Sequence, residues 1–200
     1  RKLATGLQSL GLRKNAHIGL ISKNCREWII ADMAIMMAGY VSVPFFPSLK
    51  GEELEFLLDF GNVDLLIVGK IETWNDIKSH IPNELLMISF PHYQGCSLVN
   101  RGKKWFDFID SYKPLQKPHV PKLSDLWTII FTSGTTGNPK GVELSYSTLD
   151  QTKIITEQVN PLKVDFSGNN DFISYLPLNH IVERVVVEHI CLRLDRKSVV

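Results

Sequence analysis

Residues 131–146 read FTSGTTGNPKGVELSY and gather hydroxyl side chains, glycines and one lysine in a short segment. An apolar run of strand length, residues 126–131, leads into it, so the hydroxyls follow directly after a strand. Glycines leave backbone N–H groups uncovered, and such groups together with hydroxyls can surround the oxygens of a phosphate. Lys140 adds a positive charge, and Pro139 restricts the backbone just before it. The segment is therefore a candidate phosphate-binding loop.

Two common nucleotide motifs do not fit this segment. A Walker A loop places its lysine between Gly and Ser or Thr, whereas Lys140 stands between Pro139 and Gly141, and the GxGxxG spacing is not met either. The alternative is a polar turn with a solvated lysine, but a turn alone does not require four hydroxyls beside bare glycines. The predicted phosphate-binding residues are Thr132, Ser133, Gly134, Thr135, Thr136, Gly137 and Lys140.

The elements that must position this loop alternate between strand and helix. Strands are expected at residues 17–22, 41–46, 64–69, 85–90 and 126–131, and helices at 2–10, 25–38, 50–60, 72–80, 105–111 and from about 181. Asn24 and Glu27 have the spacing of a capping box at the start of the second helix. The alternation predicts an α/β fold with mostly parallel sheets covered by helices.

Composition narrows the class of protein further. The 200 residues are 44% hydrophobic and 22% charged, which is typical of a globular chain, and the net charge of +1 gives no electrostatic footprint for nucleic acid. Cys25, Cys96 and Cys191 lie far apart without a CxxC pair, so we expect unpaired thiols. The most apolar stretch, residues 28–47, is interrupted by Asp32 and by Pro44, which indicates a buried helix and strand and not a membrane span.

The segment FTSGTTGNPKGV resembles the signature loop of the adenylate-forming superfamily, which includes acyl-CoA synthetases, peptide-synthetase adenylation domains and luciferases. The resemblance implies that the loop surrounds the β- and γ-phosphates of ATP and closes during adenylation. The N-terminal run LGLRKNAHIGLISKNCREWIIADMAIMMAGYVSVPFFPSL resembles the region where these enzymes begin their first sheet. The resemblance therefore covers nearly all of residues 1–194.

A second segment, YLPLNHIVER, resembles the corresponding stretch of long-chain fatty acyl-CoA synthetases. In relatives an aromatic residue or His at the position of His180 lies beside the reacting carboxylate, so His180 and Lys140 are the catalytic candidates, with His180 placed at a strand end facing the site. The alternative is that His180 only caps the helix after Pro177. Glu183 and Arg184 are expected to pair locally on the helix surface, without an assigned role. HExxH and HxxEH are both absent, so no zinc site is predicted and the metal ligands are unknown.

The resemblance implies the activity of a long-chain fatty acid–CoA ligase. A carboxylate attacks the α-phosphate of ATP, and coenzyme A then takes the acyl group from the acyl-adenylate. The implied cofactors and partners are ATP, Mg²⁺, coenzyme A and a long-chain fatty acid, with no nucleic acid. The alternatives are an adenylating enzyme for another carboxylic acid or acceptor, and a non-catalytic protein that kept the nucleotide loop.

The same resemblance bears on domain organisation. Residues 1–194 correspond to part of the large N-terminal AMP-binding domain, and the small C-terminal domain of the family is absent. Residues 195–200, DRKSVV, can be spelled by the codons GAT CGG AAG AGC GTC GTG, a string that matches the start of a common sequencing adapter, so our hypothesis is that they form a non-native tail. We expect a cytoplasmic enzyme, with peripheral membrane contact and oligomeric state left open.

Overall fold

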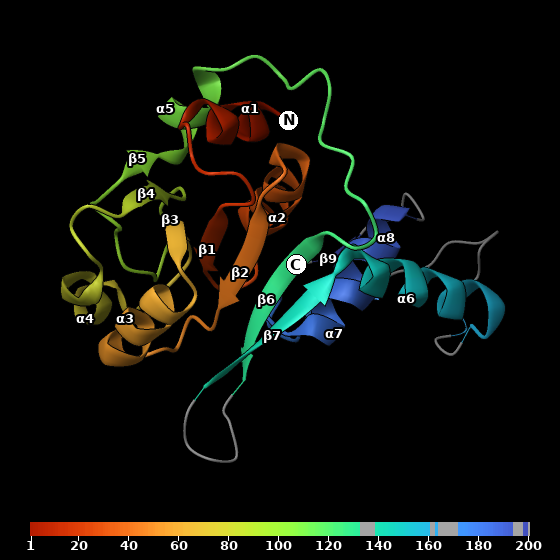
Figure 1. Cartoon of the computed structure of the whole chain (residues 1–200). Helices are drawn as coiled ribbons and strands as arrows, with labels where there is room; N and C mark the ends of the chain where they lie inside the picture. The colour runs from red at the N-terminus through yellow and green to blue at the C-terminus, as the bar shows by residue number, and fades with distance from the viewer. Residues whose placement is uncertain (133–138, 161–162, 164–171, 194–197, 200) are drawn as a thin grey trace.

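The computed structural model describes residues 1–132, 139–160, 163, 172–193 and 198–199. Its main sheet has seven strands in the order β5-β4-β3-β1-β2-β6-β7 (Figure 1). Every neighbouring pair is parallel except β6 and β7, which form an antiparallel hairpin. The strands are β1 His17–Ile21, β2 Val41–Phe45, β3 Val63–Val68, β4 Leu86–Ser89, β5 Lys103–Lys104, β6 Leu126–Thr132 and β7 Lys140–Ser145. The predicted α/β fold with a mostly parallel sheet is confirmed.

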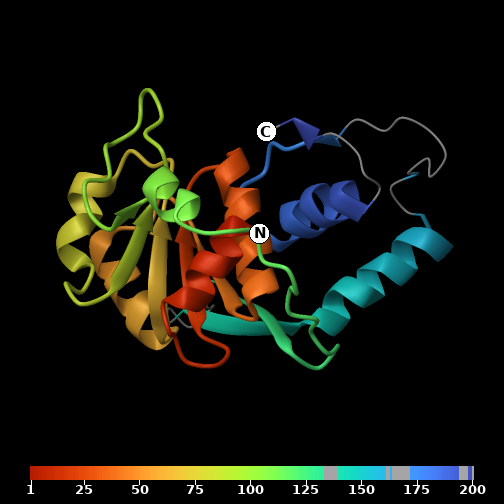
Figure 2. The same ribbon diagram turned by 90° about the horizontal axis from the view of Figure 1, so that it is seen from above.

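Helices cover both faces of this sheet. Seen from above in Figure 2, α1 and α2 lie on one side and α3 and α4 on the other. The helices are α1 Lys2–Ser9, α2 Arg26–Ala38, α3 Gly51–Phe60, α4 Trp74–Ile77, α5 Trp105–Asp110 and α6 Tyr146–Gln158. A further helical segment, residues 181–193, consists of α7 Ile181–Glu183, the π-helical turn η2 Arg184–His189 and α8 Ile190–Arg193. A short parallel pair, β8 Phe172–Ile173 with β9 Ser198–Val199, lies apart from the main sheet.

Alternation along the strands divides the core into two layers. In β3, Leu65 and Ile67 pack against α1, α2 and α5, whereas Leu66 and Val68 face the cluster under α3 and α4. Successive side chains of a strand point to opposite faces, so a strand buried on both faces has a continuous apolar sequence. This explains why the central strands appear in the sequence as unbroken apolar runs. Helix α2 ends at Gly39, whose φ of 82° lies in the left-handed region that favours glycine.

The predicted capping box at the start of α2 is wrong. The N-cap residue is Cys25, and no side chain caps the helix. The Asn24 side chain instead contacts the segment before α7: its Oδ1 accepts from the Leu178 N–H at 2.8 Å, and its Nδ2 donates to the Leu176 carbonyl at 2.7 Å. The Asn24 side chain, which the local sequence pattern would assign to the helix N-terminus, therefore binds a segment that is distant in sequence.

Residues 181–193 lie between α2 and α6 (Figure 2). A third apolar cluster holds this segment against the hairpin, because Val185 is buried with Trp127 of β6 and Tyr146 of α6, and Ile181 packs at its edge. The three cysteines are unpaired, as predicted. Over the described residues, no helix combines the length and the apolarity needed to cross a membrane.

Candidate active site

The β6–β7 hairpin carries the candidate phosphate loop at its open end. Thr132, the last residue of β6, pairs with Lys140, the first residue of β7, and both are exposed. The predicted residues Ser133, Gly134, Thr135, Thr136 and Gly137 lie between them, outside the described residues, so their role stays a prediction. The structure therefore places the lysine and the first hydroxyl opposite each other, at the two ends of this segment.

A groove of about 580 Å³ lies beside this end of the hairpin. Its wall is aromatic, because Phe45, Phe46, Phe56 and Phe131 line it, and the rings of Phe45 and Phe131 are stacked with centroids 6.0 Å apart. Thr132 and Pro139 line one part of the groove, and Glu52 and Glu53 of α3 line another. The groove lies at the carboxyl ends of the parallel strands β2 and β6, which is where ligands bind in open α/β sheets.

His180 lies at the start of α7, so its predicted position at a strand end is wrong. Its backbone N–H donates to the Pro177 carbonyl at 2.8 Å, which makes a turn immediately before the helix. Its Nδ1 accepts from the Val182 N–H at 3.3 Å, so His180 caps α7, whereas its role at the site stays a prediction. The imidazole is nevertheless exposed, and capping uses only one of its ring nitrogens. Capping and a role at the site are therefore compatible.

Arg184, one turn further along, is completely buried. Its Nε and Nη2 donate to the two carboxylate oxygens of Asp32 in α2, at 2.9 and 2.6 Å. The guanidinium also lies over the Trp127 ring at 4.3 Å and within 5.7 Å of the Trp28 ring centroid. The expected surface pair with Glu183 is wrong, because a guanidinium with a two-point contact to a buried carboxylate has no reason to turn outward.

Two hydroxyl groups complete the network around Arg184. Its Nη1 donates to Thr128 Oγ1 of β6 at 2.8 Å, and Thr128 in turn donates to the Ser42 carbonyl of β2 at 2.7 Å. Ser42 Oγ donates to Asp32 at 2.6 Å. The hydrogen bonds therefore form a closed circuit through α2, β2, β6 and the helical segment 181–193. Buried charges need such compensation, because an unmade hydrogen bond in a dry interior is costly.

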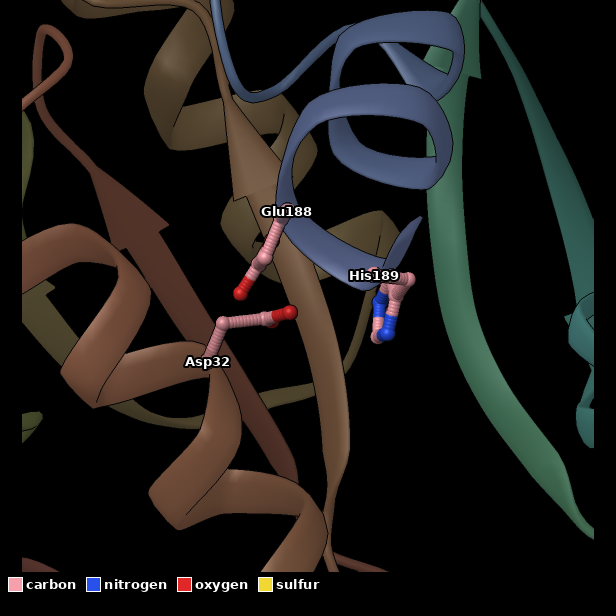
Figure 3. A group of neighbouring side chains, drawn as sticks. All are labelled: Asp32, Glu188 and His189. Carbon is pink, nitrogen blue, oxygen red and sulfur yellow. The ribbon is translucent and has the colours of Figure 1, made fainter. Parts of the chain in front are cut away.

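Glu188 and His189 approach the same carboxylate from the π-helical turn (Figure 3). The ligand atoms of Asp32, Glu188 and His189 lie within 4.8 Å of one another. Neither carboxylate oxygen of Glu188 has a hydrogen-bond partner within the part of the chain that the structure describes, and burial beside Asp32 raises the pKa of Glu188 well above its ordinary value. Burial lowers the pKa of His189 to about 4, and its ring meets the edge of Trp127 with centroids 5.1 Å apart. Burial therefore disfavours the charged form of both side chains.

The whole chain, residues 1–200, matches the profile of the family described as AMP-binding enzyme. The chain belongs to this family. Long-chain-fatty-acid–CoA ligase 1 of Homo sapiens is 31% identical over 186 residues, which cover 84% of this chain and 26% of that protein. Fatty acyl-CoA synthetase A of Dictyostelium discoideum is 30% identical over 200 residues, covering 94% of this chain and 29% of that protein. The chain thus spans less than a third of the length of these curated relatives.

Solved structures of the AMP-binding type share the fold. ATP-bound MatB from Rhodopseudomonas palustris aligns with a TM-score of 0.79 at 19% identity, over 100% of this chain and 37% of that chain. A long-chain-fatty-acid–CoA ligase from Archaeoglobus fulgidus aligns with a TM-score of 0.78 at 20% identity, over 98% of this chain and 37% of that chain. At these identities the likeness concerns the fold, and it supports the sheet order and helix placement described above.

The buried cluster of Asp32, Glu188 and His189 does not fit the magnesium that an AMP-binding enzyme would use with ATP. Asp32 already binds the Arg184 guanidinium through both oxygens. With Glu188 ionised, Asp32, Glu188 and Arg184 together carry one excess negative charge. A single proton neutralises this charge, whereas a divalent cation would leave an excess positive charge in a dry interior. Asp32 and Glu188 are at most 1% exposed, so they face no substrate. The neutral acid is the favoured state of Glu188.

Phosphate chemistry, in contrast, fits the end of the hairpin. Lys140 is an exposed cation opposite Thr132, at the carboxyl edge of the sheet and with no ion pair among the described residues. The sequence analysis found these two residues and His180 through their motifs. It missed Asp32 and Thr128 as partners of Arg184, because the contacts join residues 152 and 56 positions apart. The only available signal was a lone acid inside an apolar helix.

Proposed function

We propose that this chain is part of an AMP-forming ligase that joins a long-chain fatty acid to coenzyme A. The observation that carries the proposal is that relatives named as long-chain-fatty-acid–CoA ligases or fatty acyl-CoA synthetases align over 84% and 94% of the chain. The segment resembling their YLPL-x-H-x-x-ER stretch starts a helix that a buried arginine anchors against the sheet. The substrates would be ATP with Mg²⁺, a long-chain fatty acid and coenzyme A.

The reaction has two steps. A carboxylate oxygen forms a bond to the α-phosphorus of ATP while the bond to the β-phosphate oxygen breaks, giving acyl-adenylate and pyrophosphate. The sulfur of coenzyme A then bonds to the acyl carbon, AMP leaves, and the thiol proton is released. In the first step the protein mainly orients reactants and stabilises charge that grows on the departing pyrophosphate. Lys140 and the loop after Thr132 would supply that charge stabilisation, and His180 would orient the acyl carboxylate.

The test is an assay of the complete protein that carries these residues. Purified enzyme is given ATP, Mg²⁺, coenzyme A and either a saturated long-chain fatty acid, anthranilate, malonate or an amino acid, and AMP release and thioester formation are measured. AMP release and a thioester with the fatty acid support the proposal. AMP release only with another acid would favour an adenylating enzyme of different specificity. No AMP release with any acid, from protein that binds ATP, would favour a non-catalytic nucleotide-loop protein.

A matched pair of lysine variants sharpens this assay. Lys140→Ala removes the cation at the end of the hairpin, whereas Lys104→Ala removes an exposed lysine from β5, at the opposite edge of the sheet. The proposal requires that Lys140→Ala slows AMP release and that Lys104→Ala does not. Equal rates for the two variants would mean that the lysine of the hairpin is only a solvated charge.

A further inference from the structure

We propose that Arg184 is a positioning residue that fixes His180 relative to strand β6, and through β6 relative to Thr132 at its end. The proposal rests on the proposed function, because it concerns the adenylation step. Nothing in it requires Arg184 to touch a substrate, since the side chain is 0% exposed. Arg184 would act only by holding the groups that do.

Arg184 and His180 lie within one turn of the same helix. The two residues are four positions apart, and the Arg184 N–H donates to the His180 carbonyl at 3.2 Å, which closes the first turn of the helix. The His180 side chain is bound to the same turn through the Val182 N–H. One hydrogen bond fixes the backbone of this turn and the other fixes the His180 side chain to it. The position of Arg184 therefore determines the orientation of the imidazole.

Hydrogen bonds from α2 and from the residue just before its N-cap hold the chain on both sides of His180. Asn24, just before α2, holds the backbone of Leu176 and Leu178 by two hydrogen bonds. Asp32, within α2, holds Arg184 by two more. His180 therefore lies between two anchors on the same helix and its preceding loop. A single anchor would leave the segment free to pivot, whereas two anchors fix its direction.

Arg184 also connects this segment to strand β6. The remaining bond of the guanidinium runs to Thr128 of β6, at 2.8 Å, and β6 ends four residues later at Thr132, where the loop begins. Thr128 is 0% exposed and is itself fixed to the Ser42 carbonyl. One planar group thus ties the helix that carries His180 to the strand that leads into the loop.

The chemistry of the pair favours positioning over stability. A buried ion pair must overcome the desolvation of both charges, and apolar residues of similar volume often stabilise a fold equally well. An arginine fork adds direction, because its five donors are held in one plane and reach Asp32 and Thr128 at fixed angles. A lysine in this position would keep the charge but lose the two-point contact. The conservative variant Arg184→Lys therefore separates charge from geometry.

The experiment uses the complete enzyme and four variants: Arg184→Lys, His180→Ala, the double variant of these two, and Arg13→Lys. Arg13 is the matched control, because it pairs with Asp64 at 2.8 Å in a partly exposed ion pair at the far end of β3. Pyrophosphate exchange measures adenylation, with whichever carboxylic acid supports it. The ¹³C-labelled imidazole resonances of His180 report its orientation without any need for activity.

If Arg184 positions His180, Arg184→Lys should slow exchange by about tenfold to a hundredfold, the range expected when a reacting group is misplaced by about 1 Å. KM for ATP should change little, the His180 resonance should broaden or shift, and Arg13→Lys should do neither. The double variant should be no slower than His180→Ala alone, because both changes remove the same contribution.

Three results would overturn the proposal. They are an unchanged His180 resonance in Arg184→Lys, multiplied losses in the double variant, and equal exchange rates for Arg184→Lys and Arg13→Lys. If Arg184→Lys does not fold, Thr128→Val takes its place, because it keeps the pair with Asp32 and removes the hydroxyl that accepts from Arg184 and donates to the Ser42 carbonyl. Absence of exchange with every acid contradicts the proposed function, and the imidazole resonance still decides the positioning of His180.

Discussion

Protonation of His189 should make the fold lose stability between pH 7 and pH 5. The imidazole is half-buried against the edge of Trp127, its buried Nε2 has no hydrogen-bond partner among the described residues, and desolvation lowers its pKa from the ordinary 6.5 to about 4. Because the folded-state pKa is lowered, the unfolded chain binds a proton at pH values where the folded chain does not. The stabilisation is therefore present above pH 6.5 and is lost as the pH falls toward 4.

The size of this loss follows from the two pKa values. Each pKa unit corresponds to about 1.4 kcal/mol, and at pH 5 the unfolded His189 is almost fully protonated while the folded one is still mostly neutral. The free energy of unfolding should therefore fall by about 2 kcal/mol between pH 7 and pH 5 on account of this residue alone. His189→Phe removes the titration and keeps an aromatic ring for the contact with Trp127.

Urea unfolding at several pH values, followed by tryptophan fluorescence in dilute solution, measures this difference. The stability of His189→Phe relative to the unsubstituted chain should rise by about 2 kcal/mol from pH 7 to pH 5. His92→Gln is the control, because His92 is exposed and its Nε2 forms a hydrogen bond with the Cys96 carbonyl. Identical pH slopes for the unsubstituted chain and His189→Phe, or an NMR titration of His189 near pH 6.5, would refute the reasoning.

Further predictions concern the loop, the buried acid and the chain as a whole. Lys140→Ala should slow pyrophosphate exchange by about tenfold to a hundredfold, since one charge-assisted phosphate contact contributes about 1.5–3 kcal/mol. Thr135→Val combined with Thr136→Val should slow single-turnover adenylation more than Thr73→Val does; equal rates for the double variant and for Thr73→Val would mean that the loop does not hold phosphate. Glu188→Gln should gain stability relative to the unsubstituted chain as the pH rises above the ordinary carboxyl range, measured by urea unfolding, because the raised pKa of Glu188 makes its ionisation unfavourable in the folded state. The 200-residue chain alone should release no AMP with fatty acid and coenzyme A, and turnover would show that the implied active site is mapped wrongly.

The sheet could be predicted from the sequence because each central strand has a recognisable local sequence. The apolar runs at β1, β2, β3 and β6 are buried on both faces, and each predicted range agrees with the structure to within one or two residues. The edge strand β7 was missed because it lacks such an apolar run. Its first residues are exposed, and the sequence KGVELS neither alternates cleanly nor forms an apolar run. Its pairing with β6 is a property of the hairpin and not of its own composition.

Asn24 and His180 show that a local sequence pattern does not determine which side chain caps a helix. Asn24 has the correct spacing to Glu27 for a capping box, but its side chain binds the backbone of Leu176 and Leu178, about 150 residues away. Glu27 accepts instead from Arg26 and Tyr93. His180, which was placed at a strand end, caps α7. A side chain with two possible partners takes the one that burial makes available, and burial is a property of the whole fold.

The motif that contains Arg184 could be recognised from the sequence, although the interaction partner of Arg184 could not. Within LPLNHIVER, the neighbouring Glu183 and Arg184 suggest a surface pair, because opposite charges close in sequence are usually solvated. The helix is buried on this side, however, and a guanidinium without a carboxylate there would be far too costly. Asp32 is the acid in the middle of α2, with no exposed surface, and it too would be untenable alone. Each charge is tolerated because of the other, so the pair constrains how α2 and the helix of His180 can be arranged. An arrangement that moved either helix by one residue would leave two buried charges unpaired, and this makes the position of His180 a consequence of charge burial.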